Sequence, residues 1–253
     1  MDESRLLDLA STLAWQAAEV ILARRARGFQ TRAKGDQSPV TDADHASERV
    51  ICEGLRAAQP AIEVVAEEEI SNGYLPRSTE QMWLVDPLDG TSDFAADRDG
   101  FSVNIGLVRA GVPVLGVVME PAKARLFGGI VGGFAFIRDG AGQRPIRVRE
   151  PGAEGLRMLT SREPIDEEVL QMILRGQAIA SRQLVGSALK FCLIAQGAAD
   201  IYPRFGRSME WDTAGPDAIL RAAGGSVKDL QTGSSLLYGK KDFANGGFVA
   251  RGA

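Results

Sequence analysis

Apolar residues recur at three- and four-residue steps over the first 27 positions, and this spacing places them on one face of a helix. The series runs from Leu6 to Ile21, and Gly28 follows it. We therefore predict a long helix over residues 4–27 that ends at the glycine. A polar loop or hairpin at 31–44 and a second helix at 43–58 are predicted to follow.

Short apolar runs then alternate with turn residues, which is the pattern of strands. Two of these runs lead directly into acidic residues: 62–66 into Glu67, and 82–85 into Asp86. Strands hold their terminal residues rigidly, so carboxylates at these places are well positioned for a site. Further strands are predicted at 101–108, 112–119, 125–130 and 133–138.

A stretch rich in Gly, Pro and charge, residues 138–155, is the predicted domain boundary. We expect residues 1–145 to form an N-terminal α+β half with the metal-binding motifs. Residues 146–253 are expected to form an α/β half that closes the site and carries the substrate-binding residues. This half is predicted to contain strands at 158–160, 178–184, 200–203 and near Ser226 and Phe248, and helices at 167–175, 187–196 and 212–223.

The composition and charge of the chain argue against some classes of function and against secretion. The chain has 253 residues, 45% hydrophobic and 25% charged, and a formal net charge of −4. This balance gives no general attraction to a nucleic-acid polymer or an anionic membrane. Two cysteines are too few for a disulfide framework. With an acidic N-terminus unlike a signal peptide and no apolar run approaching a membrane span, a cytoplasmic enzyme is expected.

The run from Asp86 to Thr91, Asp-Pro-Leu-Asp-Gly-Thr, is the first candidate for chemistry. Hard cations such as Mg²⁺ bind clustered carboxylates and backbone carbonyls. Asp86 and Asp89, three positions apart, can point into one cavity with the Leu88 carbonyl between them. Taken alone, an Asp-Pro-x-Asp-Gly run is more often a plain β-turn than a metal site, because Asp, Pro and Gly are common turn residues.

Other acidic residues change that interpretation. Glu67-Glu68-Glu69 and Trp211-Asp212 occur before and after the run. Each has an ordinary alternative: the glutamates could form a solvated patch, and Asp212 could cap a helix. Those alternatives do not explain why all three motifs occur together in this order.

The order resembles that of the inositol monophosphatase-like superfamily of magnesium-dependent, lithium-sensitive phosphatases. The resemblance implies a layered α-β-α-β-α sugar-phosphatase-like fold and hydrolysis of a phosphomonoester by metal-activated water. Two or three Mg²⁺ ions per site are implied. Their ligands, carried over residue by residue, are Glu67, Asp86, the Leu88 carbonyl, Asp89, Asp212 and Asp44.

Within the superfamily the chain looks most like the CysQ group of 3′(2′),5′-bisphosphate nucleotidases. That likeness implies removal of the 3′-phosphate from adenosine 3′,5′-bisphosphate, a small-molecule phosphate ester, or its sulfated form. It assigns catalytic roles to Asp36, Thr91 and Glu67. It assigns substrate binding to Gly90, Thr91, Ser187, Lys190, Arg204 and Asp212.

Arg204 decides between substrates in this interpretation. Inositol-directed relatives tend to carry a glutamate there, which accepts hydrogen bonds from sugar hydroxyls. An arginine only donates and binds phosphate well, so a second phosphate explains it better. The alternative is that Lys190 and Arg204 are ordinary surface residues.

Three alternatives stay open from the sequence. The chain could be an inositol or a fructose-1,6-bisphosphate phosphatase of the same superfamily, or a non-catalytic binding protein on this fold. Departures from the CysQ pattern at Ala66, Ser92-Asp93 and Gly215-Pro216 leave room for a shifted substrate range.

The only histidine, His45, is expected on a helix surface, since a metal-activated water needs no histidine base. Relatives are commonly dimers, so a homodimer is one option.

Overall fold

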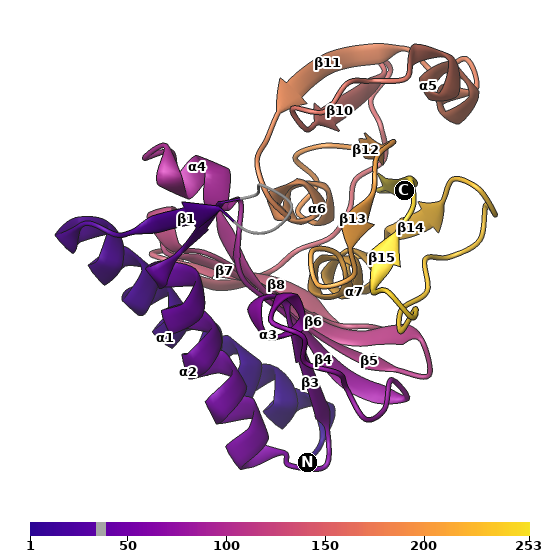
Figure 1. Cartoon of the computed structure of the whole chain (residues 1–253). Helices are drawn as coiled ribbons and strands as arrows, with labels where there is room; N and C mark the ends of the chain where they lie inside the picture. Colours follow the sequence, from indigo (N-terminus) through magenta and orange to yellow (C-terminus); the bar gives the residue numbers. More distant parts are fainter. Residues whose placement is uncertain (34–38) are drawn as a thin grey trace.

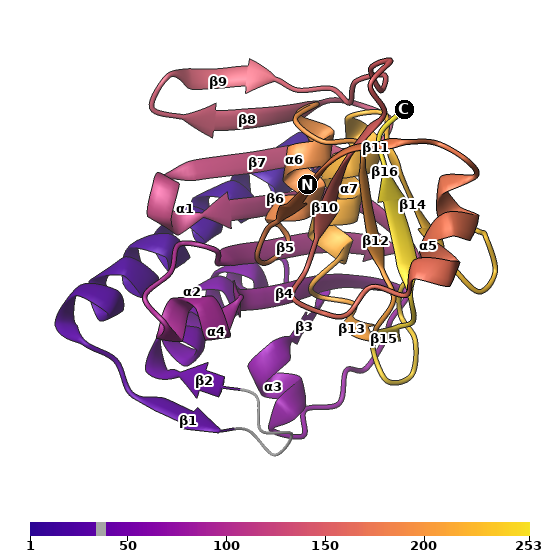
Figure 2. The same cartoon turned by 90° about the horizontal axis from the view of Figure 1, so that it is seen from above.

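The computed structural model of the chain describes residues 1–33 and 39–253. Its helices and sheets alternate in five layers (Figure 1). The first layer consists of α1 (Glu3–Arg27) and α2 (Asp42–Ala58), which pack on one face of a seven-stranded sheet. The strand order of that sheet is β3-β4-β5-β6-β7-β8-β9, and Figure 2 shows these strands side by side. Their bounds are β3 (Glu63–Ala66), β4 (Gln81–Asp89), β5 (Ser102–Arg109), β6 (Val112–Glu120), β7 (Arg125–Ile130), β8 (Ala135–Asp139) and β9 (Gly142–Pro145).

The other face of this sheet is covered by α6 (Leu189–Ala195) and α7 (Ala214–Ala222). A five-stranded sheet of order β11-β10-β12-β16-β14 and then α5 (Glu167–Leu174) complete the layers. Its strands are β10 (Leu156–Thr160), β11 (Ile179–Leu184), β12 (Ile201–Arg204), β14 (Ser226–Asp229) and β16 (Phe248–Arg251). Short elements connect them: β1 (Thr31–Ala33), β2 (Pro39–Thr41), α3 (Glu67–Ser71), α4 (Thr91–Ala95), the 3₁₀ turn η1 (Pro121–Lys123), β13 (Ser208–Met209) and β15 (Ala244–Asn245). The predicted layered fold is confirmed.

Helix α1 begins with a capped turn, because the Asp2 carboxylate accepts a hydrogen bond from the Arg5 N–H. Its buried face, which runs from Leu6 to Ile21, packs against the large sheet and α2. By its length, and because an 18-residue stretch of it has a mean hydropathy of 1.3, α1 could cross a membrane, contrary to the prediction that no apolar run approaches a membrane span. Half of that apolar stretch is buried inside the protein, so α1 serves as a core helix.

Helix α7 lies unusually close to the sheet, and glycines make this possible. A Cβ on Gly116 of β6 would stand 2.1 Å from the Gly215 carbonyl oxygen, and one on Gly106 of β5 would stand 2.4 Å from the Gly215 nitrogen. Any larger side chain at these positions would force the helix outward. Gly215 therefore has a packing role, and Pro216 lies in the first turn of α7, where proline is tolerated. The close fit carries Asp212, just before α7, toward the end of β4.

Most predicted elements are confirmed within a few residues. The interpretation of Asp86–Asp89 as a turn is wrong, because β4 continues to Asp89 with an irregular register between these two aspartates. The chain instead turns at Gly90, whose φ of 89° is a conformation that favours glycine. Asp212 also lies outside α7, whose N-cap is Thr213. The proposed division at residue 145 falls between the two sheets and stays a prediction.

Candidate active site

Asp86 and Asp89 occupy the last part of β4, where the strand ends beside the C-terminal half. Asp86 is almost completely buried, and one of its oxygens accepts a hydrogen bond from the Leu88 N–H at 3.0 Å. Asp89 accepts from the Ala188 N–H at 2.6 Å and from the Asn104 amide at 3.3 Å. Because Ala188 precedes α6, Asp89 joins the two halves of the chain at this point.

Carboxylates gather around Asp86. Burial raises its pKa well above the ordinary value, and the negative charges of Glu67, Asp89 and Asp212 raise it further. Burial likewise raises the pKa of Asp89, although the positive charge of Lys190 opposes this. The pKa of Asp212 is raised to about 8 by burial and then by Asp89 and Glu67. These side chains therefore share one electrostatic site, in which their negative charges repel one another.

Asp44, on the first turn of α2, is connected to the same site through Thr91. The Thr91 hydroxyl lies 3.0 Å from Asp44 Oδ1 and 3.0 Å from the Leu88 carbonyl oxygen. Its single proton can go to only one of them at a time. Asp44 also accepts from the Thr41 N–H and hydroxyl in a capping box, which fixes its rotamer.

Glu67 opens α3, directly after β3. The next N–H, that of Glu68, donates to the buried Glu48 carboxylate at 2.7 Å. Burial raises the pKa of Glu48 to about 8, and the neighbouring glutamates contribute. Glu69 pairs with Arg56. Glu67-Glu68-Glu69 is therefore buried or held by partners within the protein, and it is not a solvated patch.

The donor set suits a hard divalent cation, because it consists of carboxylates and a backbone carbonyl without sulfur or imidazole. Their mutual repulsion is what a cation would relieve. Among residues 1–33 and 39–253, no three Asp, Glu, His or Cys side chains already stand close enough together to enclose an ion.

The opposite wall of the site is basic. Lys190 is buried on α6, and its ammonium group donates to the carbonyls of Val185, at 3.1 Å, and Ser187, at 2.6 Å. It also lies 4.9 Å from the centre of the Tyr202 ring. Burial lowers the pKa of Lys190 to about 8, while Asp89 acts in the other direction. The alternative that Lys190 is a surface lysine is excluded by this burial.

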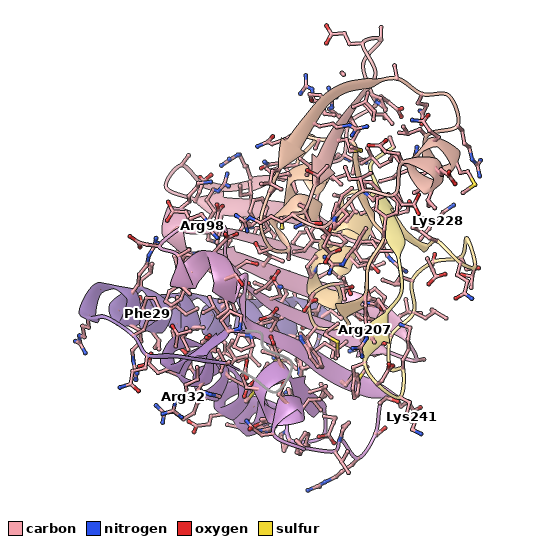
Figure 3. The ribbon with its side chains drawn as sticks, turned by 45° about the horizontal axis from the view of Figure 1, so that its top comes forward. Phe29, Arg32, Arg98, Arg207, Lys228 and Lys241 are labelled. Carbon is pink, nitrogen blue, oxygen red and sulfur yellow. The ribbon has the colours of Figure 1, made fainter. Side chains whose placement is uncertain are left out.

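Arg204, at the end of β12, is also held in place. Its guanidinium donates to Glu163 at 2.6 Å and to the Arg207 carbonyl at 2.7 Å, and it reaches the Tyr202 hydroxyl at 3.5 Å. Figure 3 shows Arg207 on the β13 side of the molecule and Arg98 on the α4 side.

Arg98 and Arg162 both pair with Asp93 of α4, so an ion pair from the β10–α5 segment also connects the two halves.

A cavity of about 220 Å³ lies between these walls. Of the predicted site residues, it is lined by Asp89, Gly90, Ser187, Lys190, Arg204 and Asp212. The cavity lining does not include Asp86, Glu67, Leu88, Thr91 or Asp44. Asp86 and Glu67 interact with Asp89 and Asp212 through their charges, and Thr91 contacts Asp44 and the Leu88 carbonyl. Asp36 lies outside the described residues. A larger cavity of about 830 Å³, around the starts of β3 and β4, contains no predicted site residue.

Sequence reasoning missed several residues that line the cavity. They are Arg162, Glu163, Tyr202 and Ser208. Tyr202 lies in the strand predicted at 200–203, close to Arg204. The other three belong to no motif, and only the fold brings them to the site.

Comparison with known proteins now decides the family. The model of the inositol monophosphatase family matches residues 2–252. The chain belongs to the inositol monophosphatase family. The 3′(2′),5′-bisphosphate nucleotidase CysQ of Salmonella typhimurium is 38% identical, over 96% of this chain and 98% of that protein. The CysQ of Buchnera aphidicola is 37% identical, over 97% of this chain and 93% of that protein.

The fold agrees with this membership. The crystal structure of CysQ from Bacteroides thetaiotaomicron, a bacterial member of this family, superposes with a TM-score of 0.80. It is 29% identical, and the match covers 98% of this chain and 97% of the other. The family and fold expected from the three acidic motifs are therefore confirmed.

Proposed function

We propose that this protein is a Mg²⁺-dependent phosphomonoesterase that removes the 3′-phosphate of adenosine 3′,5′-bisphosphate. One observation carries the proposal: Asp89 and Asp212 share one cavity with Lys190 and Arg204, and their charges act on the buried Asp86. The named relatives, which are 3′(2′),5′-bisphosphate nucleotidases, support the same substrate.

The acidic wall is proposed to hold two or three Mg²⁺ ions through Glu67, Asp86, the Leu88 carbonyl, Asp89, Asp212 and Asp44. When bound, the ions would lower the pKa of a water and neutralise the leaving oxygen. Thr91, which contacts Asp44, is proposed to orient the attacking water, and Gly90, which lines the cavity, to contact the transferred phosphate. Asp36 is proposed to assist Thr91.

The basic wall is proposed to bind the rest of the nucleotide. Arg204 would face the phosphate that is not transferred, with Ser187 beside it. Lys190 would act mainly by holding the segment from Val185 to Ser187, since two of its three N–H donors already bind carbonyls there. A cytoplasmic location belongs to the proposal, because both cysteines are free thiols.

Side-by-side turnover of three esters tests the proposal. We expect kcat/KM for adenosine 3′,5′-bisphosphate to exceed those for inositol 1-phosphate and fructose 1,6-bisphosphate at least about tenfold, the effect of one well-placed charged hydrogen bond. All three reactions should require Mg²⁺. Faster turnover of either polyol phosphate would replace this proposal by the corresponding sugar phosphatase. No turnover of any ester would favour a non-catalytic binding protein.

A further inference from the structure

Three unsatisfied polar atoms belong to residues that line the same cavity. Within residues 1–33 and 39–253, five buried side-chain nitrogen or oxygen atoms have no hydrogen-bond partner. Three of the five are Ser187 Oγ, Arg204 Nε and Ser208 Oγ. Buried polar groups in native proteins are nearly always satisfied, so such a concentration at one cavity calls for a partner from outside the chain.

Ser208 is the member of this group that no motif identifies. It is only 6% exposed, and it lies on β13 between Arg204 and Asp212 along the chain. Its strand is fixed on both sides. The Met209 N–H donates to Asp212 at 3.0 Å, and the Asn245 amide donates to the Met209 carbonyl at 3.4 Å. The backbone that carries Ser208 is therefore held in place, and rotation about the Cβ–Oγ bond can aim the hydroxyl proton at a ligand.

Ser187 adds an independent feature. Its φ of 46° lies in the left-handed region, which is costly for a serine. The strained residue is retained by Lys190, which binds its carbonyl, and by the neighbouring Ala188 N–H, which binds Asp89. Strain that the surroundings maintain in this way is typical of residues that contact a ligand.

The chemistry of the three atoms identifies the ligand class. Arg204 Nε can only donate a hydrogen bond, and both serine hydroxyls can donate. Several donors from one cavity wall match a group with many acceptor oxygens and no protons to offer, which describes a phosphate better than a sugar hydroxyl. Nη2 of the guanidinium already donates to Glu163 and to the Arg207 carbonyl, and Nη1 reaches the Tyr202 hydroxyl at 3.5 Å. Nε is the nitrogen of this group that is buried without a partner.

We infer that Ser208 is a specificity-determining residue that, with Arg204 Nε and Ser187, binds the phosphate that the enzyme does not remove. The inference rests on the proposed function, because only a bisphosphate substrate retains a phosphate after hydrolysis. Ser208 acts in substrate recognition and not in the chemical step.

Adenosine 5′-monophosphate is the sharpest probe, because it carries only the retained phosphate. Calorimetric titration should give a dissociation constant about tenfold weaker for Ser208→Ala than for the wild type, the size expected for a hydrogen bond to a charged group. Adenosine without phosphate should bind both proteins equally. Ser208→Thr, which keeps the hydroxyl, should stay near the wild type. Ser181→Ala, which removes an exposed serine on β11, is the matched control and should change nothing.

Kinetics separate recognition from a structural role. With adenosine 3′,5′-bisphosphate, Ser208→Ala should raise KM about tenfold and leave kcat unchanged. With adenosine 3′-monophosphate, which lacks the second phosphate, KM should not change. A loss equal for both substrates, or unchanged binding of adenosine 5′-monophosphate, would overturn the inference while leaving the nucleotidase function intact. Ser208-dependent binding without any hydrolysis of the bisphosphate would instead overturn the proposed function and keep the phosphate site.

Discussion

The two walls of the cavity differ in how their charges are balanced. On the acidic wall, burial and mutual repulsion raise the pKa values of Asp86, Asp89 and Asp212. On the basic wall, the charge of Arg204 is met by Glu163, and Lys190 is met by backbone carbonyls. The cations that we propose for the acidic wall would relieve this repulsion. The two cations of the basic wall already have partners within the protein. The wall still offers individual hydrogen-bond donors, which suits it to recognition of the substrate.

Removing a carboxylate from the acidic wall should have the largest effect. We expect Asp89→Asn to lower kcat for any phosphate ester about 10³-fold, which corresponds to several kcal/mol of lost charge stabilisation. The measurement is steady-state turnover at saturating Mg²⁺. Asp8→Asn, an exposed change on α1, serves as the control. A rate for Asp89→Asn within threefold of the wild type would mean that the acidic wall takes no part in catalysis.

Reversing a charge on the basic wall should change substrate choice more than chemistry. We expect Arg204→Glu to lower kcat/KM for adenosine 3′,5′-bisphosphate about 10²-fold more than for adenosine 3′-monophosphate, because a carboxylate would face the second phosphate. Arg207→Glu is the matched control, since that side chain is exposed and pairs only weakly with Asp242, at 3.5 Å. Equal losses on both substrates would remove Arg204 from recognition.

The smallest effect concerns stability and its dependence on pH. Since the folded protein holds the Asp212 proton up to about pH 8, this group stabilises the fold fully below its ordinary pKa. The stabilisation is then lost as the pH rises to about 8. Without Mg²⁺, Asp212→Asn should therefore match the wild-type melting temperature near pH 4 and exceed it by a few degrees at pH 8.

Added Mg²⁺ should make the wild type melt at a higher temperature than Asp212→Asn at pH 8. The wild type should gain melting temperature with Mg²⁺ at pH 8 and much less at pH 5, because protons compete with the cation for the carboxylates. Asp212→Asn should lose most of this gain. Thermal unfolding at several pH values with and without Mg²⁺ measures both effects. An Asp212→Asn protein that is less stable than the wild type at pH 8 without Mg²⁺ would contradict the account of uncompensated charge.

The acidic wall could be predicted from the sequence, because its residues lie in three short motifs at the ends of strands. The predicted turn at Asp86 and Asp89 is nevertheless wrong. Both residues belong to an irregular strand, because β4 pairs with β5 further along the chain than the turn residues suggest. The role of Gly215 depends on its contact with Gly106 and Gly116, about 100 positions away, which a local pattern does not reveal.

The basic wall could be predicted only in part. The family resemblance predicts a binding role for Arg204, but the partner of Arg204, Glu163, lies 41 positions away and belongs to no motif. Ser208 gives no sequence signal, since a single serine is unremarkable until its hydroxyl proves to be buried without a partner. Recognition residues scattered over several elements need the fold before they can be identified.

The most direct measurement of the central claim is which phosphate remains on the nucleotide. If the acidic wall holds the transferred phosphate and the basic wall the retained one, adenosine 3′,5′-bisphosphate with Mg²⁺ should give adenosine 5′-monophosphate and inorganic phosphate. Phosphorus NMR of the products distinguishes this from the alternative. Accumulation of adenosine 3′-monophosphate would mean that the substrate binds in the opposite orientation, and it would contradict the division of roles between the two walls.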